Sequence, residues 1–223
     1  MSQYLDLKKV DRKVFTTSFD DGLVDIFLSS VTLMWAVGPL TTSYLNTYLG
    51  DFWGDFWGTL IFLPFWGILY LILRWIHKRL VAPRMGVVQY GPTRRKKMSL
   101  FSGIMVVLNS IFMILGLVAF LNQDSPRWTR MLPFTVMLLL SFSLAGYFMN
   151  LNRLYVYGIM LGMAPLVGEY LSQMFGVVHH GYPITFGLSA VIIFVIGLIK
   201  LITFMQHNPL PSDDPIQWEG NND

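Results

Sequence analysis

Charged residues divide the chain into long apolar stretches, and the lengths of these stretches predict the fold. No Asp, Glu, Lys or Arg occurs at 26–50, 56–73, 98–123 or 131–152, and the only one at 154–199 is Glu169. An α-helix needs about 20 predominantly apolar residues to cross a bilayer, so the last stretch has room for two crossings. We therefore predict an all-α bundle of six transmembrane helices, at about 23–46, 57–79, 99–121, 131–151, 154–176 and 183–206.

The distribution of basic residues predicts the orientation of these helices. Of the 16 Lys and Arg residues, all but Arg127 and Arg130 fall on one side of the predicted bundle. Connections rich in Lys and Arg stay in the cytoplasm. Both termini are then predicted to be cytoplasmic, and the predicted outer connections are 47–56, 122–130 and 177–182.

Composition agrees with this pattern and excludes several classes of protein. Hydrophobic residues make up 54% of the chain and charged residues 13%, which is about half the charged share of an ordinary soluble domain. The absence of cysteine excludes disulfide scaffolds, cysteine-ligated metals and thiol nucleophiles. We find no signal peptide and no catalytic sequence motif, and we expect neither a cofactor nor a bound metal.

The two ends of the chain are predicted to lie outside the six-helix domain at 21–206. Residues 1–20 carry Leu7, Val10 and Val14 at helical spacing among basic residues, which is typical of a helix on the inner membrane surface; a solvated tail is the alternative. Residues 207–223 are rich in proline and acidic residues, a composition typical of disorder.

A basic inner loop is predicted at 80–98, between the second and third helices. Arg94, Arg95, Lys96 and Lys97 stand together at its end. Such a run fixes the orientation of the chain and attracts anionic lipid headgroups. It also suits docking of a cytoplasmic protein partner, whereas it is too short and too close to the membrane for nucleic acid.

Ionisable residues inside membrane spans are the first candidates for function, because burying a charge in a membrane is costly. Glu169 is predicted in the outer half of the fifth helix, beyond a bend at Pro165, and is a candidate proton or cation ligand. A protonated, purely structural Glu169 is the alternative. His179 and His180 follow in the next outer turn as further ligand candidates, although adjacent histidines make a poor chelating pair for a metal.

Acidic residues at the start of the first helix are predicted to be structural. Ser18 and Asp21 stand at the spacing of a capping box, and an acid there favours the positive end of the helix dipole. Asp25 lies one turn further on. We predict an ion pair between Asp25 and one of three arginines, Arg79, Arg84 or Arg153.

Two segments resemble a group of uncharacterised bacterial membrane proteins. Residues 21–27 read Asp-Gly-Leu-Val-Asp-Ile-Phe, against Asp-Gly-Leu-Trp-Asp-Ile in that group. Residues 83–88 read Pro-Arg-Met-Gly-Val-Val, against Pro-Arg-x-Gly-Tyr-Val. The resemblance brings no activity, but it implies a bacterial inner membrane and a contact between Asp21 or Asp25 and Arg84. The inner-face cluster that it implies consists of Asp21, Asp25, Pro83, Arg84 and Gly86.

Three functions are compatible with the sequence. The first is a non-enzymatic accessory, scaffold or regulatory subunit that docks a partner at its basic loop or forms a homo-oligomer, and the missing catalytic motifs favour it. The second is a small proton- or cation-coupled transporter or channel that uses Glu169. The third is an intramembrane enzyme acting on lipid, which requires Glu169 and a histidine within hydrogen-bond reach of each other.

Overall fold

The computed structural model describes residues 19, 21–85, 92–121 and 126–209. Every regular element within these residues is helical. The elements are α2 (Leu23–Leu49), α3 (Asp51–Leu60), α4 (Phe62–Ile76), the π-helical turn η1 (His77–Val81), α5 (Ala82–Met85), α6 (Pro92–Leu121), α7 (Arg127–Met149), α8 (Arg153–Phe175), the 3₁₀ turn η2 (His179–Gly181) and α9 (Tyr182–His207).

Six of the described helical stretches are long and apolar enough to cross a membrane, which confirms the predicted fold class. The chain is therefore a multi-pass membrane protein. The spans are Leu23–Leu49, Asp51–Arg84, Arg95–Ala119, Trp128–Met149, Arg153–Phe175 and His179–His207. Following the predicted orientation, we name the end of the bundle that holds Leu23 and Arg153 the inner end, and the end that holds His179 the outer end.

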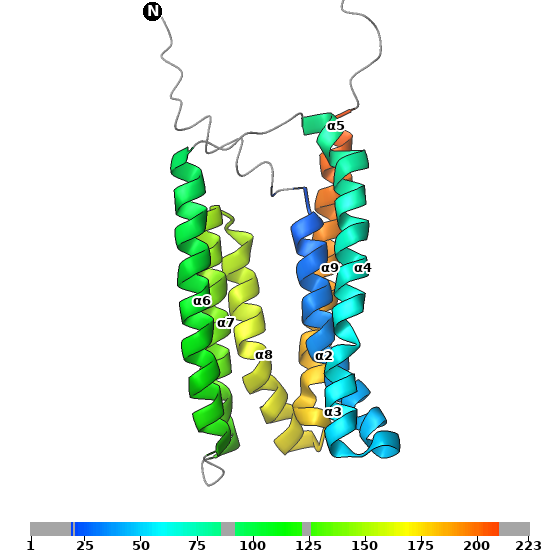
Figure 1. The fold of residues 1–223 in the computed structure, drawn as a ribbon, viewed down its shortest axis with the longest axis vertical. Coiled ribbons are helices and arrows are strands. Elements are labelled where there is room, and N and C mark those ends of the chain that lie inside the picture. Colours follow the sequence, from blue (N-terminus) through cyan, green and yellow to red (C-terminus); the bar gives the residue numbers. More distant parts are fainter. Residues whose placement is uncertain (1–18, 20, 86–91, 122–125, 210–223) are drawn as a thin grey trace, which may run out of the picture.

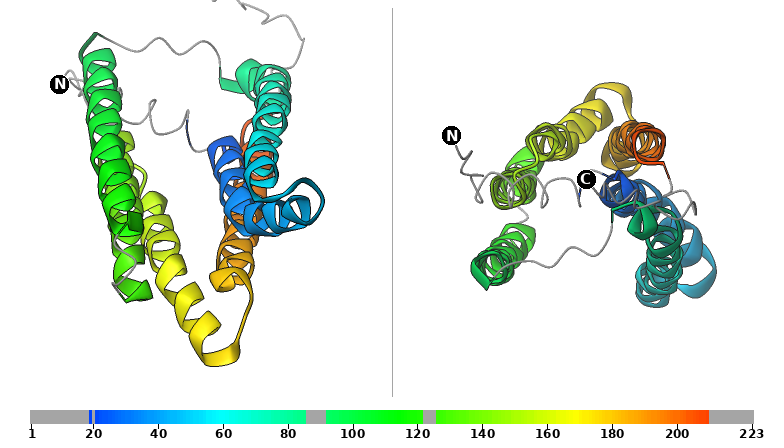
Figure 2. Two further views of the ribbon diagram at one scale, coloured as in Figure 1. Left: turned by 60° about the horizontal axis from the view of Figure 1, so that its bottom comes forward. Right: turned by 90° about the horizontal axis from the view of Figure 1, so that it is seen from above.

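The spans form two groups that meet where α8 passes into α9. Figure 1 shows α6, α7 and α8 on one side and α2, α3, α4 and α9 on the other, with the turn between α8 and α9 at the outer end. Seen from above, the helices follow an open arc in the order α6, α7, α8, α9, α2, α4 (Figure 2). Relative motion of the two groups would therefore act on η2.

Close backbone packing fixes α2 against α9. Gly22 has φ +80°, and a Cβ there would collide with the carbonyl oxygen of Gly197 on α9. A left-handed backbone and a close approach both favour glycine. The main hydrophobic core then joins both helix groups, because Ala36 of α2 and Phe186 of α9 belong to the same buried cluster as Tyr157 of α8.

Two predicted connections are wrong because charged residues end an apolar stretch without ending a helix. The outer connection predicted at 47–56 is reduced to Gly50, because α2 ends at Leu49 and α3 begins at Asp51. Asp55 also lies within α3. The inner loop predicted at 80–98 is helical up to Met85 and again from Pro92, so residues 94–97 belong to the first turns of α6. Proline suits the first turn of a helix, where its missing N–H costs nothing. The predicted surface helix within 1–20, Gly86 and most of the tail at 207–223 lie outside the described residues.

Candidate functional site

Glu169 is buried near the outer end of α8 and contacts a histidine. The residue is 1% exposed. Its Oε2 lies 2.7 Å from Nδ1 of His180, and its Oε1 accepts a hydrogen bond of 2.9 Å from Nε2 of Gln173. The His180 side chain is 45% exposed. A buried carboxylate is thus connected to the surface at the outer end through an imidazole.

A left-handed turn places His180 over Glu169. His179, His180 and Gly181 have φ values of 53°, 54° and 66°. For a residue with a Cβ, this conformation costs about 1–2 kcal/mol. Gly181 lies directly on Gly168 of α8, where a Cβ at Gly181 would stand 2.6 Å from the Gly168 carbonyl oxygen. Strained backbone of this kind concentrates at functional sites, so the turn marks Glu169 and His180 as a candidate site.

Tyr182, at the start of α9, links this pair to α7. Its ring centroid lies 5.8 Å from that of His180, and its hydroxyl donates a hydrogen bond of 2.8 Å to Sδ of Met131. Three helices therefore converge at the outer site. The His179 side chain makes no hydrogen bond or ion pair within the described part of the chain, so of the two predicted histidines His180 is the one that joins the site.

The outer site can hold and exchange a proton. Both an imidazole and a carboxylate can bind a proton, and here the imidazole side chain is 45% exposed while the carboxylate is buried. Among the residues that the structure describes, no three His, Asp or Glu side chains gather in a way that could hold a metal ion.

A second buried charge pair lies at the inner end, between α2 and α8. Asp25 is 0% exposed, and its Oδ1 accepts a hydrogen bond of 2.9 Å from Nε of Arg153. Arg153 Nη2 also donates to the carbonyl oxygen of Phe19, at 2.6 Å. Of the three arginines predicted as partners of Asp25, Arg153 is the one that the structure shows. The buried Tyr157 hydroxyl lies close to the Asp25 carboxylate.

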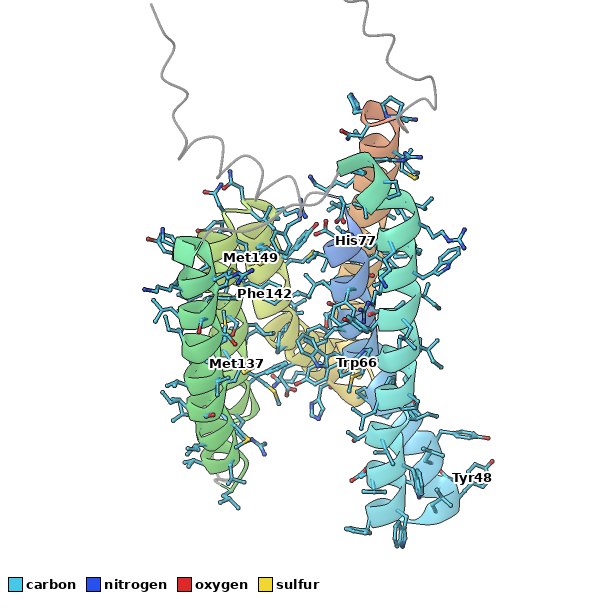
Figure 3. The ribbon with its side chains drawn as sticks, turned by 45° about the horizontal axis from the view of Figure 1, so that its top comes forward. Tyr48, Trp66, His77, Met137, Phe142 and Met149 are labelled. Atoms are coloured by element: carbon cyan, nitrogen blue, oxygen red, sulfur yellow. The ribbon has the colours of Figure 1, made fainter. Side chains whose placement is uncertain are left out.

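The predicted contact between Arg84 and an acid of the first helix is wrong. Arg84 Nη1 instead donates a hydrogen bond of 2.9 Å to the carbonyl oxygen of Met205, near the end of α9. The helical path through η1 and the short α5 carries Pro83 and Arg84 beyond the start of α2. The inner-face cluster therefore consists of Asp21, Asp25 and Arg153 together with His77, which is labelled in Figure 3.

Asp21 caps α2 and faces a histidine. Its Oδ1 accepts a hydrogen bond of 3.1 Å from the Leu23 amide, and its Oδ2 lies 3.5 Å from Nδ1 of His77. The structure begins α2 at Leu23, later than a capping box opened by Ser18 would, and Asp21 accepts from the first helical amide. Ser18 lies outside the described residues. Burial raises the pKa of Asp21 above its ordinary value of 3.8, against the opposing effects of the Leu23 amide and His77.

We expect Asp21→Asn to be more stable than the wild type at neutral pH. The raised pKa means that the folded state favours the protonated acid, so wild-type stability falls as the pH rises from 3.8 through the folded-state value. Asparagine keeps an acceptor for the Leu23 amide and carries no charge to bury. Melting temperatures of both proteins, measured from acidic to neutral pH, should converge on the acid side and separate at neutral pH. A less stable Asn variant at neutral pH would contradict this account.

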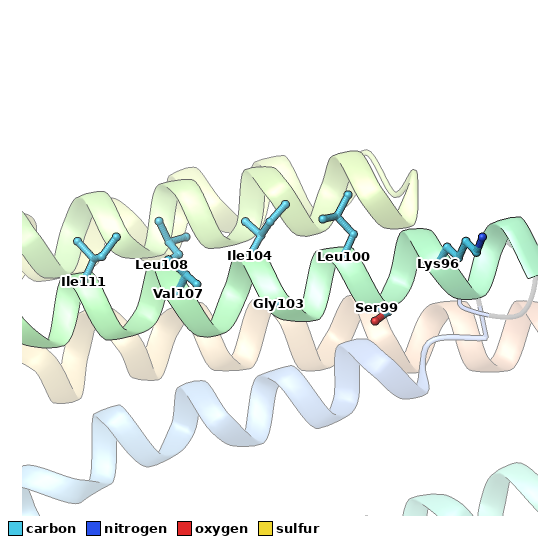
Figure 4. A pocket seen from close by; sticks show the side chains of 8 residues that line it. All are labelled: Lys96, Ser99, Leu100, Gly103, Ile104, Val107, Leu108 and Ile111. Atoms are coloured by element: carbon cyan, nitrogen blue, oxygen red, sulfur yellow. The ribbon is translucent and has the colours of Figure 1, made fainter.

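The predicted docking residues lie along an apolar helix. The side chains of Arg95, Lys96 and Lys97 are exposed in the first turns of α6, whereas that of Arg94 is outside the description. Further along α6, a hollow of 760 Å³ runs from Lys96 to Ile111 (Figure 4). None of the α6 span is buried within the described structure. The basic residues thus continue into a helix face that is free to meet lipid or protein.

Sequence reasoning missed three residues of the two sites. Gln173 stands four residues after Glu169, a spacing that brings side chains together on a helix and is visible in the sequence. Tyr182 and His77 gave no such signal, because their partners lie on other helices. The distance between Glu169 and His180 required the turn geometry, which sequence spacing alone does not provide.

The comparisons with known proteins give no relative. No family model matches the chain, and neither a curated protein nor a solved structure matches it. The resemblance of residues 21–27 and 83–88 to bacterial membrane proteins stays a prediction.

Proposed function

We propose that this chain is a small proton- or cation-coupled membrane transport protein in which Glu169 and His180 form the ion-binding pair. One observation carries the proposal: a carboxylate that is 1% exposed in a membrane helix lies 2.7 Å from an imidazole that is 45% exposed. The proposal also includes a bacterial inner membrane, which the resemblance of residues 21–27 and 83–88 implies, with both termini in the cytoplasm, which the distribution of basic residues supports.

The energetics of a buried carboxylate support ion coupling. A carboxylate inside a membrane protein is costly unless a proton, a protonated histidine or another cation neutralises it. Binding or release at Glu169 therefore changes the energy of the contact between α8 and η2. Because η2 connects the two helix groups, this contact is well placed to couple ion binding to their relative position.

The inner pair supports the same proposal. At its outer end α8 contacts η2, which leads into α9, through Glu169 and His180, and at its inner end it contacts α2 through Arg153 and Asp25. Both α9 and α2 belong to the other helix group. A helix held at both ends by separable charge pairs is the kind of two-position element that alternating access requires.

Charge displacement after a pH jump tests the ion-binding pair without a known substrate. Proteoliposomes are adsorbed on a solid-supported membrane, and the current after a rapid pH change at the outer face is integrated. The wild type is expected to give a transient displacement, and Glu169→Gln is expected to reduce it to the level of empty liposomes. Asp55→Asn is the matched control, because Asp55 is an outer acid that accepts a hydrogen bond from Asn46 and lies outside the pair.

Equal displacement in the wild type and in Glu169→Gln, at equal melting temperatures, would overturn the proposal. The accessory or scaffold function would then be the better candidate. The specific observation that favours it is α6, whose span contributes no buried residue and whose first turns carry Arg95, Lys96 and Lys97. A lipid-acting enzyme stays a prediction.

A further inference from the structure

A pocket lined by aromatic rings lies in the outer half of the bundle. It has a volume of 360 Å³ and is bordered by α2, α3, α4, α7 and α9, so both helix groups contribute to it. Its rings are Trp35, Phe62, Phe134, Tyr182 and Phe186. Trp35 meets Phe134 and Phe186 edge to face, with centroid distances of 5.5 and 5.3 Å. The size is at the lower end of the range for small-molecule sites.

The hydroxyl groups that line the pocket already donate hydrogen bonds within the protein. Thr42 Oγ1 donates to the carbonyl oxygens of Gly38 and Pro39, each at 3.1 Å. Thr59 Oγ1 donates to the Asp55 carbonyl oxygen at 2.9 Å, and the Tyr182 hydroxyl donates to Met131. The indole N–H of Trp35 is the one side-chain donor left among the described lining residues. What the hydroxyls still offer a ligand is their lone pairs.

A proline adds a further acceptor. Pro39 has no N–H, so the carbonyl oxygen of Trp35, four residues earlier in α2, lacks its usual helical donor. Both Pro39 and Trp35 border the pocket, and no Lys, Arg or His does. Apart from the Trp35 indole N–H, the remaining polar features are therefore a carbonyl oxygen, hydroxyl lone pairs and ring faces, all of which carry partial negative charge.

The pocket is also connected to the ion-binding pair. Tyr182 lines the pocket, and its ring is tilted by 39° against that of His180 at a centroid distance of 5.8 Å; His180 in turn contacts Glu169. A ligand that pushes on Tyr182 would therefore act on the pair through one ring contact. Ligand binding in the pocket and ion binding at Glu169 can therefore influence each other.

We infer that this pocket binds a small organic ammonium ion with apolar substituents. Ring faces attract ammonium groups, Trp most strongly, and the attraction grows when water is excluded. The apolar substituents fill the rest of the ring-lined space. An anion would find one N–H donor, which is too little to replace its hydration. The claim that the ammonium ion is a transported substrate rests on the proposed function. The claim that it binds this pocket does not.

Equilibrium dialysis of the full-length protein in nanodiscs tests the inference. The probe is radiolabelled phenyltrimethylammonium, compared with neutral benzyl alcohol and anionic benzenesulfonate. We expect Trp35→Leu to weaken binding of the cation about 10-fold or more, and Trp35→Phe to weaken it only about 3-fold, because phenylalanine keeps a ring face and removes the N–H. Trp53→Leu is the control, since Trp53 is an exposed ring on α3 outside the pocket.

Three results would overturn the inference. They are equal affinity for the cation and benzyl alcohol, tighter binding of benzenesulfonate, and equal loss of cation binding in Trp35→Leu and Trp53→Leu. If Trp35→Leu does not fold, Phe134→Leu takes its place, since Phe134 lines the same pocket. Dialysis requires no pH change, so absence of cation binding would leave the charge displacement at Glu169 intact, and the two failures remain distinguishable.

Discussion

Replacing Arg153 with methionine is expected to lower the melting temperature by roughly 10 °C. The substitution leaves the Asp25 carboxylate, which is 0% exposed, without the guanidinium that neutralises it at 2.9 Å. It also removes the donor to the Phe19 carbonyl oxygen. Removing one partner of a buried ion pair costs about 3–5 kcal/mol. Each kcal/mol shifts the melting temperature by about 2–4 °C in a chain of this length.

The matched control is Arg79→Met. Arg79 is exposed on η1 and lies over the Trp75 ring at 5.7 Å, so the loss of a surface arginine is expected to cost no more than about 0.5 kcal/mol. A double variant, Arg153→Met with Asp25→Leu, removes both buried charges and should recover most of the lost stability. A loss in Arg153→Met as small as in Arg79→Met would contradict the burial of the pair.

The helices could be predicted from the sequence because one rule governs them all. A stretch of apolar residues about 20 long has to be helical in a membrane, since only a helix satisfies its backbone hydrogen bonds there. The rule does not predict where a helix ends when charged residues continue it beyond the hydrocarbon core of the bilayer. For this reason the apolar pattern predicts connections at residues 51–56 and 94–97, whereas these residues form parts of α3 and α6.

The sequence predicts which buried acids belong to the candidate sites more readily than it predicts which side chains they contact. The cost of a charge in a membrane singled out Glu169 and Asp25, and both are buried. Their partners depend on tertiary structure. Arg153 is selected over Arg84 because the start of α8 brings its side chain within reach of Asp25, whereas Arg84 is bonded to Met205 of α9. His180 is selected over His179 by three consecutive left-handed residues. Neither packing nor a left-handed turn of this length has a sequence pattern that predicts it.

Gly181→Ala is expected to disable the outer site, because the turn that carries His180 could no longer rest on α8. Gly181 has φ +66°, and an added Cβ would stand 2.6 Å from the Gly168 carbonyl oxygen and 3.0 Å from its Cα. These are backbone atoms, so relief requires η2 to move away from α8. Such a movement separates His180 from Glu169, and the charge displacement after a pH jump should be lost with it. The added strain should cost about 1–3 kcal/mol beyond the penalty of the left-handed conformation.

Gly176→Ala separates the penalty of the left-handed conformation from the effect of the close contact with α8. Gly176 has φ +65°, nearly that of Gly181, but a Cβ there would meet no atom within 4 Å. It should therefore show the conformational penalty alone, about 1–2 kcal/mol, with the charge displacement unchanged. If Gly181→Ala behaves like Gly176→Ala in both stability and charge displacement, the close contact between η2 and α8 does not position His180. If both lose the displacement, the backbone conformation near the turn matters more than the contact. The expected difference between two alanines of nearly equal φ assigns the function to the contact between Gly181 and Gly168.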